Sequence, residues 1–99
     1  MTIKDFQETV KTVTRGICRK RHCSAKKINE GLCFDWATEV FSLVWDRGCK
    51  ICGHNGHAYI EYRGRFYDSE TPHGVKRWRR LPFFVATNTT EEIEKLRMP

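Results

Sequence analysis

The sequence lacks any apolar run that approaches the roughly 20 residues needed for a membrane-spanning helix. Its first residues, Met1 to Glu8, contain no apolar core of a secretory signal. It also has no internal repeat, no linker and no low-complexity block. These absences predict a cytoplasmic protein without a membrane partner, built as a single domain over residues 1–99.

The cysteine count is the most informative part of the composition. The chain has 5 cysteines, an odd number that cannot be paired completely within one chain. In the cytoplasm, where disulfides are rare, cysteines are catalytic, bound to a metal ion or simply buried. The cysteines are therefore the residues at which we expect the chemistry of this protein.

Charge gives a second, weaker indication. The 18 basic residues outnumber the 12 acidic ones, and the net charge of +6 favours acidic partners. The predicted partner-binding residues come from two basic stretches: Arg19, Lys20, Arg21, Lys76, Arg77, Trp78, Arg79 and Arg80. Trp78, among cations, suits stacking on a base of single-stranded nucleic acid. No RNA-binding motif accompanies it, so an acidic protein or peptide is the favoured partner.

Apolar spacing predicts two main helices. The first begins near the N-terminus and is expected to end at Gly16, and the basic stretch 15–27 follows as a loop or a short solvated helix. Apolar residues recur at helical spacing from Cys33 onward and predict a helix that ends near Gly48. A short acidic helix capped by Thr90 is expected at the C-terminal end.

Three segments rich in β-forming residues predict a small antiparallel sheet: residues 49–52, 57–62 and 65–68. Arg63-Gly64 is expected to form a two-residue hairpin turn. Tyr59 then opposes Asp68 and His57 opposes Glu70, so these side chains share one face of the sheet. The predicted fold class is therefore α+β, with the Cys33 helix packed on the sheet.

Cys33, His57 and Asp68 have the residue types and positions of a catalytic triad. The N-terminal turn of a helix stabilises a thiolate at Cys33. His57 opens a strand and can act as its base, and Asp68 on the paired strand can orient the histidine. Taken singly, such a cysteine is usually a buried hydrophobe and such a histidine a surface residue. Together the three residues predict nucleophilic chemistry.

The sequence around these residues resembles a known family. Residues 31–37, Gly-Leu-Cys-Phe-Asp-Trp-Ala, are similar to the Gly-x-Cys-x-Asp-aromatic-Ala signature around the nucleophile of transglutaminase-like proteins. Residues 56–62 resemble their His-Ala-aromatic-x-Glu strand, and residues 65–69 resemble the Asp strand that follows. The broader group is the papain-like superfamily, which includes the NlpC/P60 and CHAP amidohydrolases. The resemblance covers about residues 29–70 and implies a minimal papain-like core.

The resemblance also implies roles for the residues. Cys33 would be the nucleophile, His57 the base and then the acid, and Asp68 the orienting residue. The backbone N–H of Cys33 would stabilise the oxyanion, with the Asn29 side chain as a second donor. The implied activity is that of a thiol hydrolase or acyltransferase (a cysteine peptidase, an amidase or a transglutaminase-like enzyme) that acts on an amide or peptide bond without a cofactor.

A non-catalytic function on the same fold remains open. The short stretch between Cys33 and His57 leaves little room for substrate-binding insertions. The alternative is a basic binding or inhibitor module that engages an acidic protein or a nucleic acid.

A zinc site is a further alternative. Cys49 and Cys52 have the C-x-x-C spacing of a zinc knuckle, and Cys18 with Cys23 would complete four ligands. However, Cys49 and Cys52 fall where a strand is predicted, and a strand would point them to opposite faces. We therefore expect no metal at these cysteines.

Overall fold

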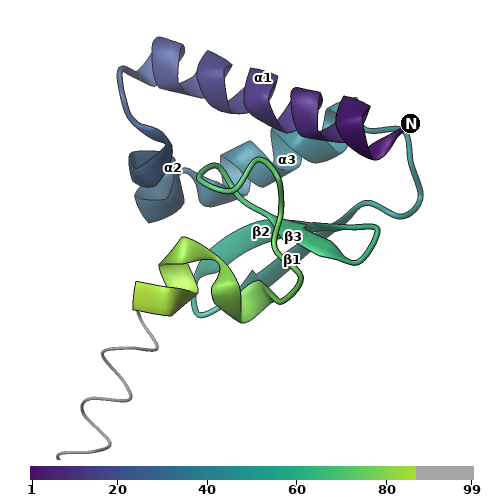
Figure 1. Ribbon diagram of the computed structural model, residues 1–99. Helices are drawn as coiled ribbons and strands as arrows, with labels where there is room; N and C mark the ends of the chain where they lie inside the picture. The colour runs from purple at the N-terminus through teal and green to yellow at the C-terminus, as the bar shows by residue number, and fades with distance from the viewer. Residues whose placement is uncertain (87–99) are drawn as a thin grey trace, which may run out of the picture.

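The computed structural model describes residues 1–86, and the helix predicted from Thr90 lies outside them. The elements are, in chain order, α1 (Ile3–Arg21), α2 (Ala25–Gly31), α3 (Cys33–Leu43), β1 (Lys50–His54), β2 (His57–Tyr62), β3 (Arg65–Tyr67) and the 3-10 helix η1 (Trp78–Arg80) (Figure 1). The strands form one antiparallel sheet in the order β1-β2-β3, which confirms the predicted α+β class. Within residues 1–86, no helix is long and apolar enough to cross a membrane.

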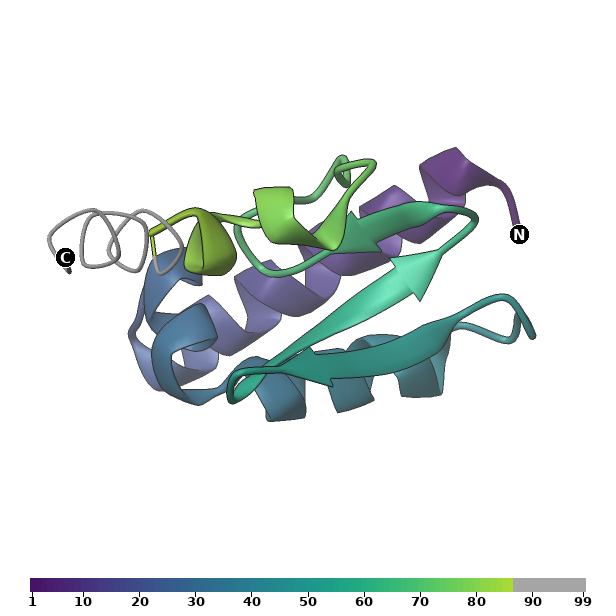
Figure 2. The ribbon, with the colours of Figure 1, turned by 90° about the horizontal axis from the view of Figure 1, so that it is seen from below.

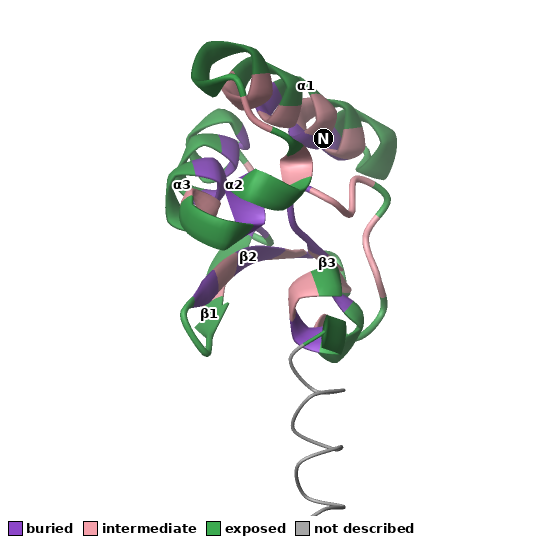
Figure 3. Cartoon of the chain, turned by 90° about the vertical axis from the view of Figure 1, so that its left-hand side faces the viewer, coloured by how far each residue is buried: buried purple, intermediate pink, exposed green. Residues whose placement is uncertain are grey.

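Each face of the sheet is covered by a different part of the chain. Helices α1 and α3 lie on one face, and the segment from η1 to residue 86 lies on the other (Figures 1 and 2). The larger core cluster joins both helices to the sheet through residues such as Phe6, Trp36 and Tyr62. The smaller cluster contains Tyr59 and Phe84 on the opposite face. Figure 3 shows the burial of β2, which lies between the two layers.

Helix α1 continues past Gly16, so the predicted end at this glycine is wrong. A Cβ at Gly16 would meet no atom within 4 Å, which places this position on an open helix surface where glycine costs only about 1 kcal/mol. The helix ends instead at Arg21, and the left-handed backbone of the C-cap residue His22 (φ 52°) closes the last turn. Three cations, Arg19 to Arg21, occupy that turn, where the helix dipole favours positive charge.

Helix α3 is shorter than predicted. It ends at Leu43 rather than near Gly48, because Val44 turns extended (ψ 111°) and buries its side chain against the larger core cluster. The following loop is closed by Asp46, whose carboxylate accepts a hydrogen bond from the backbone N–H of Gly48 at 2.9 Å. The apolar pattern thus predicted the helix and its buried face but not its last turn.

The β2–β3 hairpin has the predicted register. Tyr62 pairs with Arg65 and Ile60 pairs with Tyr67, with no bulge between them. Arg63 (φ 49°) and Gly64 (φ 77°) both adopt positive φ angles, as a two-residue turn of a tight hairpin requires. This register sets the positions of His57 and Asp68, which the candidate site needs.

Candidate active site

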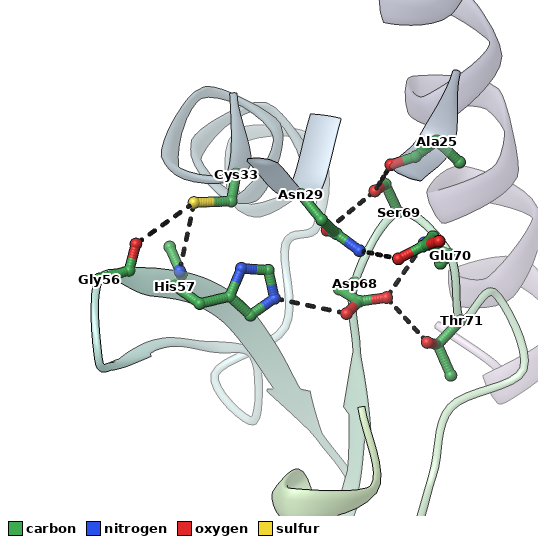
Figure 4. Close-up of polar contacts among 10 residues, drawn as sticks. Ala25, Asn29, Cys33, Gly56, His57, Asp68, Ser69, Glu70 and Thr71 are labelled. Atoms are coloured by element: carbon green, nitrogen blue, oxygen red, sulfur yellow. Dashed lines mark hydrogen bonds and ion pairs between the residues drawn. The ribbon is translucent and has the colours of Figure 1, made fainter. Parts of the chain in front are cut away.

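Cys33 is placed over the start of β2 by a break between two helices. Leu32 (φ −122°, ψ 17°) leaves the helical conformation, so α2 ends and α3 begins with Cys33. Leu32, the N-cap residue of α3, makes no side-chain hydrogen bond to the first turn of this helix. The Cys33 Sγ accepts from the backbone N–H of Ala58 at 3.4 Å and lies 3.9 Å from the carbonyl oxygen of Gly56 (Figure 4). The sulfur therefore contacts the backbone on both sides of His57.

His57 and Asp68 form a buried pair. The exposed fractions are 1% for His57 and 0% for Asp68, and His57 Nε2 lies 3.3 Å from Asp68 Oδ2. Because a carboxylate only accepts hydrogen bonds, this contact favours the proton on Nε2 and leaves Nδ1 with a free lone pair. Nδ1 is buried and makes no hydrogen bond within residues 1–86. In Figure 4 it lies on the side of the ring that faces Cys33.

Asp68 is held by the turn that follows β3. Its Oδ1 accepts from the backbone N–H of Glu70 at 3.0 Å and from the Thr71 hydroxyl at 2.7 Å. These bonds fix one oxygen and leave Oδ2 for His57. Thr71 was not among the predicted site residues, although an aspartate followed by polar residues at a strand end is typical of such a turn.

Two phenylalanines cover the histidine. The ring of Phe83 stacks on His57 with centroids 4.5 Å apart, and Phe84 packs edge-on at 5.4 Å. Both belong to the helical turn at residues 82–86, on the face of the sheet opposite α3. No sequence signal indicated that this segment reaches the candidate site.

Asn29 is close to the pair but engaged by other groups. Its Nδ2 donates to Glu70 Oε2 at 2.7 Å, and its Oδ1 lies 2.9 Å from the Ser69 hydroxyl. Ser69 also contacts the carbonyl oxygen of Ala25 at 2.6 Å. Asn29 thus ties α2 to the turn that carries Asp68 (Figure 4). Its role as an oxyanion donor stays a prediction.

A cavity of about 280 Å³ opens beside this group of residues. Asn29, Glu70 and Phe83 line it, so it borders both the polar link and the ring that covers His57. Pro82 adds apolar surface, and Lys26 adds a cation.

The four other cysteines do not gather into a metal site. Within residues 1–86, no group of three or more His, Cys, Asp or Glu side chains can hold a metal ion. Cys49 packs in the larger core cluster and Cys52 against the smaller one, on opposite faces of the sheet. Burial raises the pKa of Cys49 to about 11, and burial is also the main cause of the raised pKa values of Cys18 and Cys52. Such thiols are poor sources of the thiolate that zinc requires.

The predicted partner-binding residues lie in two places. Arg19, Lys20 and Arg21 are exposed at the end of α1, and Lys76, Arg77, Arg79 and Arg80 are exposed around η1. Trp78 is half-buried, with His54 stacked on its ring at 4.2 Å and the Arg79 guanidinium 5.2 Å from its centroid. The ring is thus packed by the protein's own side chains, and we do not propose that it stacks on a base.

No family of known proteins, no curated protein and no solved structure matches this chain.

Proposed function

We propose that this protein is a small thiol hydrolase or acyltransferase of papain-like architecture that acts on amide bonds of a protein or peptide. One observation carries the proposal: Asp68 holds the Nε2 side of the His57 ring, and the buried Nδ1, which has no hydrogen-bond partner within residues 1–86, lies on the side of the ring toward Cys33. A base oriented by a carboxylate next to a nucleophile is the arrangement that acyl transfer needs.

In the proposed reaction, Cys33 Sγ attacks the carbonyl carbon of the amide and its proton passes to His57 Nδ1. For this transfer the sulfur must leave the Gly56 carbonyl oxygen and approach Nδ1, since catalytic hydrogen bonds often tighten only when substrate is bound. Asp68 stabilises the imidazolium that forms, through the contact at Nε2.

The negative charge of the tetrahedral intermediate develops at the N-terminus of α3. The N-cap residue Leu32 makes no side-chain hydrogen bond to the backbone N–H groups of that turn, which leaves them as donors for the oxyanion. His57 then gives its proton to the leaving amine, and the acyl group stays on Cys33 as a thioester. Attack by water or by another amine, with Nδ1 again as the base, releases the product and restores the thiol.

Acylation by an activated ester tests the proposal without a known substrate. Incubation with p-nitrophenyl acetate should add one acetyl group, and peptide mapping should place it on Cys33. The variant Cys33→Ser should gain none, and His57→Gln should react much more slowly, because glutamine can donate to Asp68 but supplies no base. Acetylation spread evenly over the five thiols, or none at Cys33, would contradict the proposal.

A further inference from the structure

Two cysteines meet at the end of α1, away from the candidate active site. The backbone N–H groups of His22 and Cys23 both donate to the carbonyl oxygen of Cys18, the latter at 3.1 Å. This type of helix ending frequently brings the side chains at the positions of Cys18 and Cys23 into contact, and, besides burial, a hydrogen bond with the Cys23 side chain is among the causes that raise the pKa of Cys18. Both thiols are free and half-buried, and both pack against the larger core cluster. The backbone itself therefore brings these two sulfurs together.

Cys23 also lines a cavity of about 470 Å³ between the end of α1 and α2. Arg21, His22 and Lys27 share its lining. The one carboxylate among the lining residues, Glu30, is already paired with Lys27 at 3.5 Å. The volume falls within the range of small-molecule sites, and the two lining cations, Arg21 and Lys27, outnumber this carboxylate by one, which favours an anion.

We propose that Cys23 is a site of thiol–disulfide exchange with an anionic low-molecular-weight disulfide, such as glutathione disulfide, and that Cys18 is its resolving thiol. The Cys23 thiolate attacks one sulfur of the bound disulfide, whose S–S bond breaks and releases one glutathione thiolate. Cys18 then gives its proton to solvent and attacks the Cys23 sulfur, which releases the second glutathione. The two cysteines lose two electrons and form one disulfide, and glutathione disulfide is reduced to two thiols.

The geometry assigns the two roles. Cys23 borders the cavity, whereas Cys18 is not among its lining residues, so the incoming disulfide meets Cys23 first. Burial, together with the neighbouring Cys23, raises the pKa of Cys18 and keeps it a thiol until the second step. We expect no disulfide between the cysteines of the C-x-x-C motif, because Cys49 and Cys52 lie on opposite faces of the sheet.

Exchange with glutathione disulfide on the full chain tests the proposal by intact mass and peptide mapping. The wild type should lose two hydrogens, with Cys18 bridged to Cys23 and the other three thiols still free. Cys18→Ser should stop at a mixed disulfide that carries one glutathione on Cys23, and Cys23→Ser should form neither product. Cys49→Ser, the matched control, should behave as the wild type.

A second comparison tests the cavity and leaves the cysteines in place. Arg21→Gln combined with Lys27→Gln, two exposed positions, should slow exchange with glutathione disulfide about tenfold and leave exchange with the cationic cystamine no slower. A bridge between Cys49 and Cys52, or no glutathione on Cys23 in Cys18→Ser, would overturn the exchange site. If the exchange rates with glutathione disulfide and with cystamine fell equally, the cavity would not be a binding site for anions. None of these outcomes depends on acylation of Cys33, so the two proposals fail separately.

Discussion

His57 Nε2 lies 3.3 Å from Asp68 Oδ2, and the two side chains have exposed fractions of 1% and 0%. A carboxylate this deeply buried is costly unless it is hydrogen-bonded. Asp68 accepts from a backbone N–H, from a hydroxyl and from the histidine, so each of its oxygens is engaged. The turn after β3 thus holds Asp68 in the position that orients the imidazole ring of His57.

The first prediction concerns that orientation. In Asp68→Asn, an amide, which can also donate a hydrogen bond, replaces the carboxylate, which can only accept. The tautomer of His57 with its proton on Nε2 is then no longer favoured. Acetylation of Cys33 by p-nitrophenyl acetate should slow by about 10²-fold or more. Near-wild-type acetylation in a folded Asp68→Asn variant would show that the pair is structural.

A second prediction separates two contributions of Thr71 to stability, the hydrogen bond of its hydroxyl and the packing of its side chain. Thr71→Val removes the 2.7 Å bond to Asp68 and keeps the side-chain volume, so the free energy of unfolding should fall by about 2 kcal/mol. Thr71→Ser keeps the hydroxyl and should restore most of this loss. Urea unfolding measures both variants, and an equal loss in the two would contradict a role for the hydrogen bond.

The hairpin register, and with it the His57–Asp68 pairing, could be predicted because local signals agreed. Arg63-Gly64 is a typical two-residue turn, and the alternation of side chains along each strand determines which residues share a face of the sheet. Cys33 at a helix start was likewise predicted from apolar spacing, since that helix buries Trp36, Ala37 and Val40 on one side.

Other parts of the site depend on contacts between distant segments. Phe83 reaches His57 only after the chain has crossed to the other face of the sheet, which no local pattern indicates. The bond from Asn29 to Glu70 spans 41 positions, so its amide was assigned to the oxyanion without knowledge of this partner. The continuation of α1 past Gly16 was missed because the cost of one exposed glycine is small against the rest of the helix.

The third prediction uses two glycines with similar backbones. A Cβ at Gly74 (φ 74°) would lie 2.7 Å from Tyr67 Cζ, whereas at Gly64 (φ 77°) it would meet nothing within 4 Å. Gly64→Ala should therefore cost about 1 kcal/mol of unfolding free energy, from the positive φ alone. Gly74→Ala should cost about 3 kcal/mol, because overlap with a buried ring is added. Similar losses in denaturant unfolding would show that Tyr67 moves aside.

A fourth prediction concerns alkaline stability. The pKa of Cys49 rises from 9.0 to about 11 on folding, because burial disfavours the thiolate. The folded protein then holds a proton that the unfolded chain releases, so the free energy of unfolding should fall as the pH rises from 9 to 11. Tyr59, whose pKa rises from 10.0 to about 12, adds a loss at higher pH for the same reason.

Cys49→Ala isolates the contribution of the thiol. Because this variant has no group to titrate at that position, its unfolding free energy should decline less steeply between pH 9 and 10 than that of the wild type. The comparison uses the slope with pH, so the cost of the smaller side chain cancels. Parallel slopes would show that Cys49 is accessible to solvent in the folded state.

Activation of the Cys33 thiol by His57 can be measured directly, by the rate at which iodoacetamide alkylates this thiol. Site-resolved labelling rates should place Cys33 first among the five thiols and the buried Cys49 last. In His57→Gln the rate at Cys33 should fall about tenfold or more, while the rates at the other four stay unchanged. The proposed thiol chemistry would be contradicted if Cys33 in the wild type reacted no faster than Cys23 or Cys52. It would also be contradicted if the rate at Cys33 were the same in His57→Gln as in the wild type.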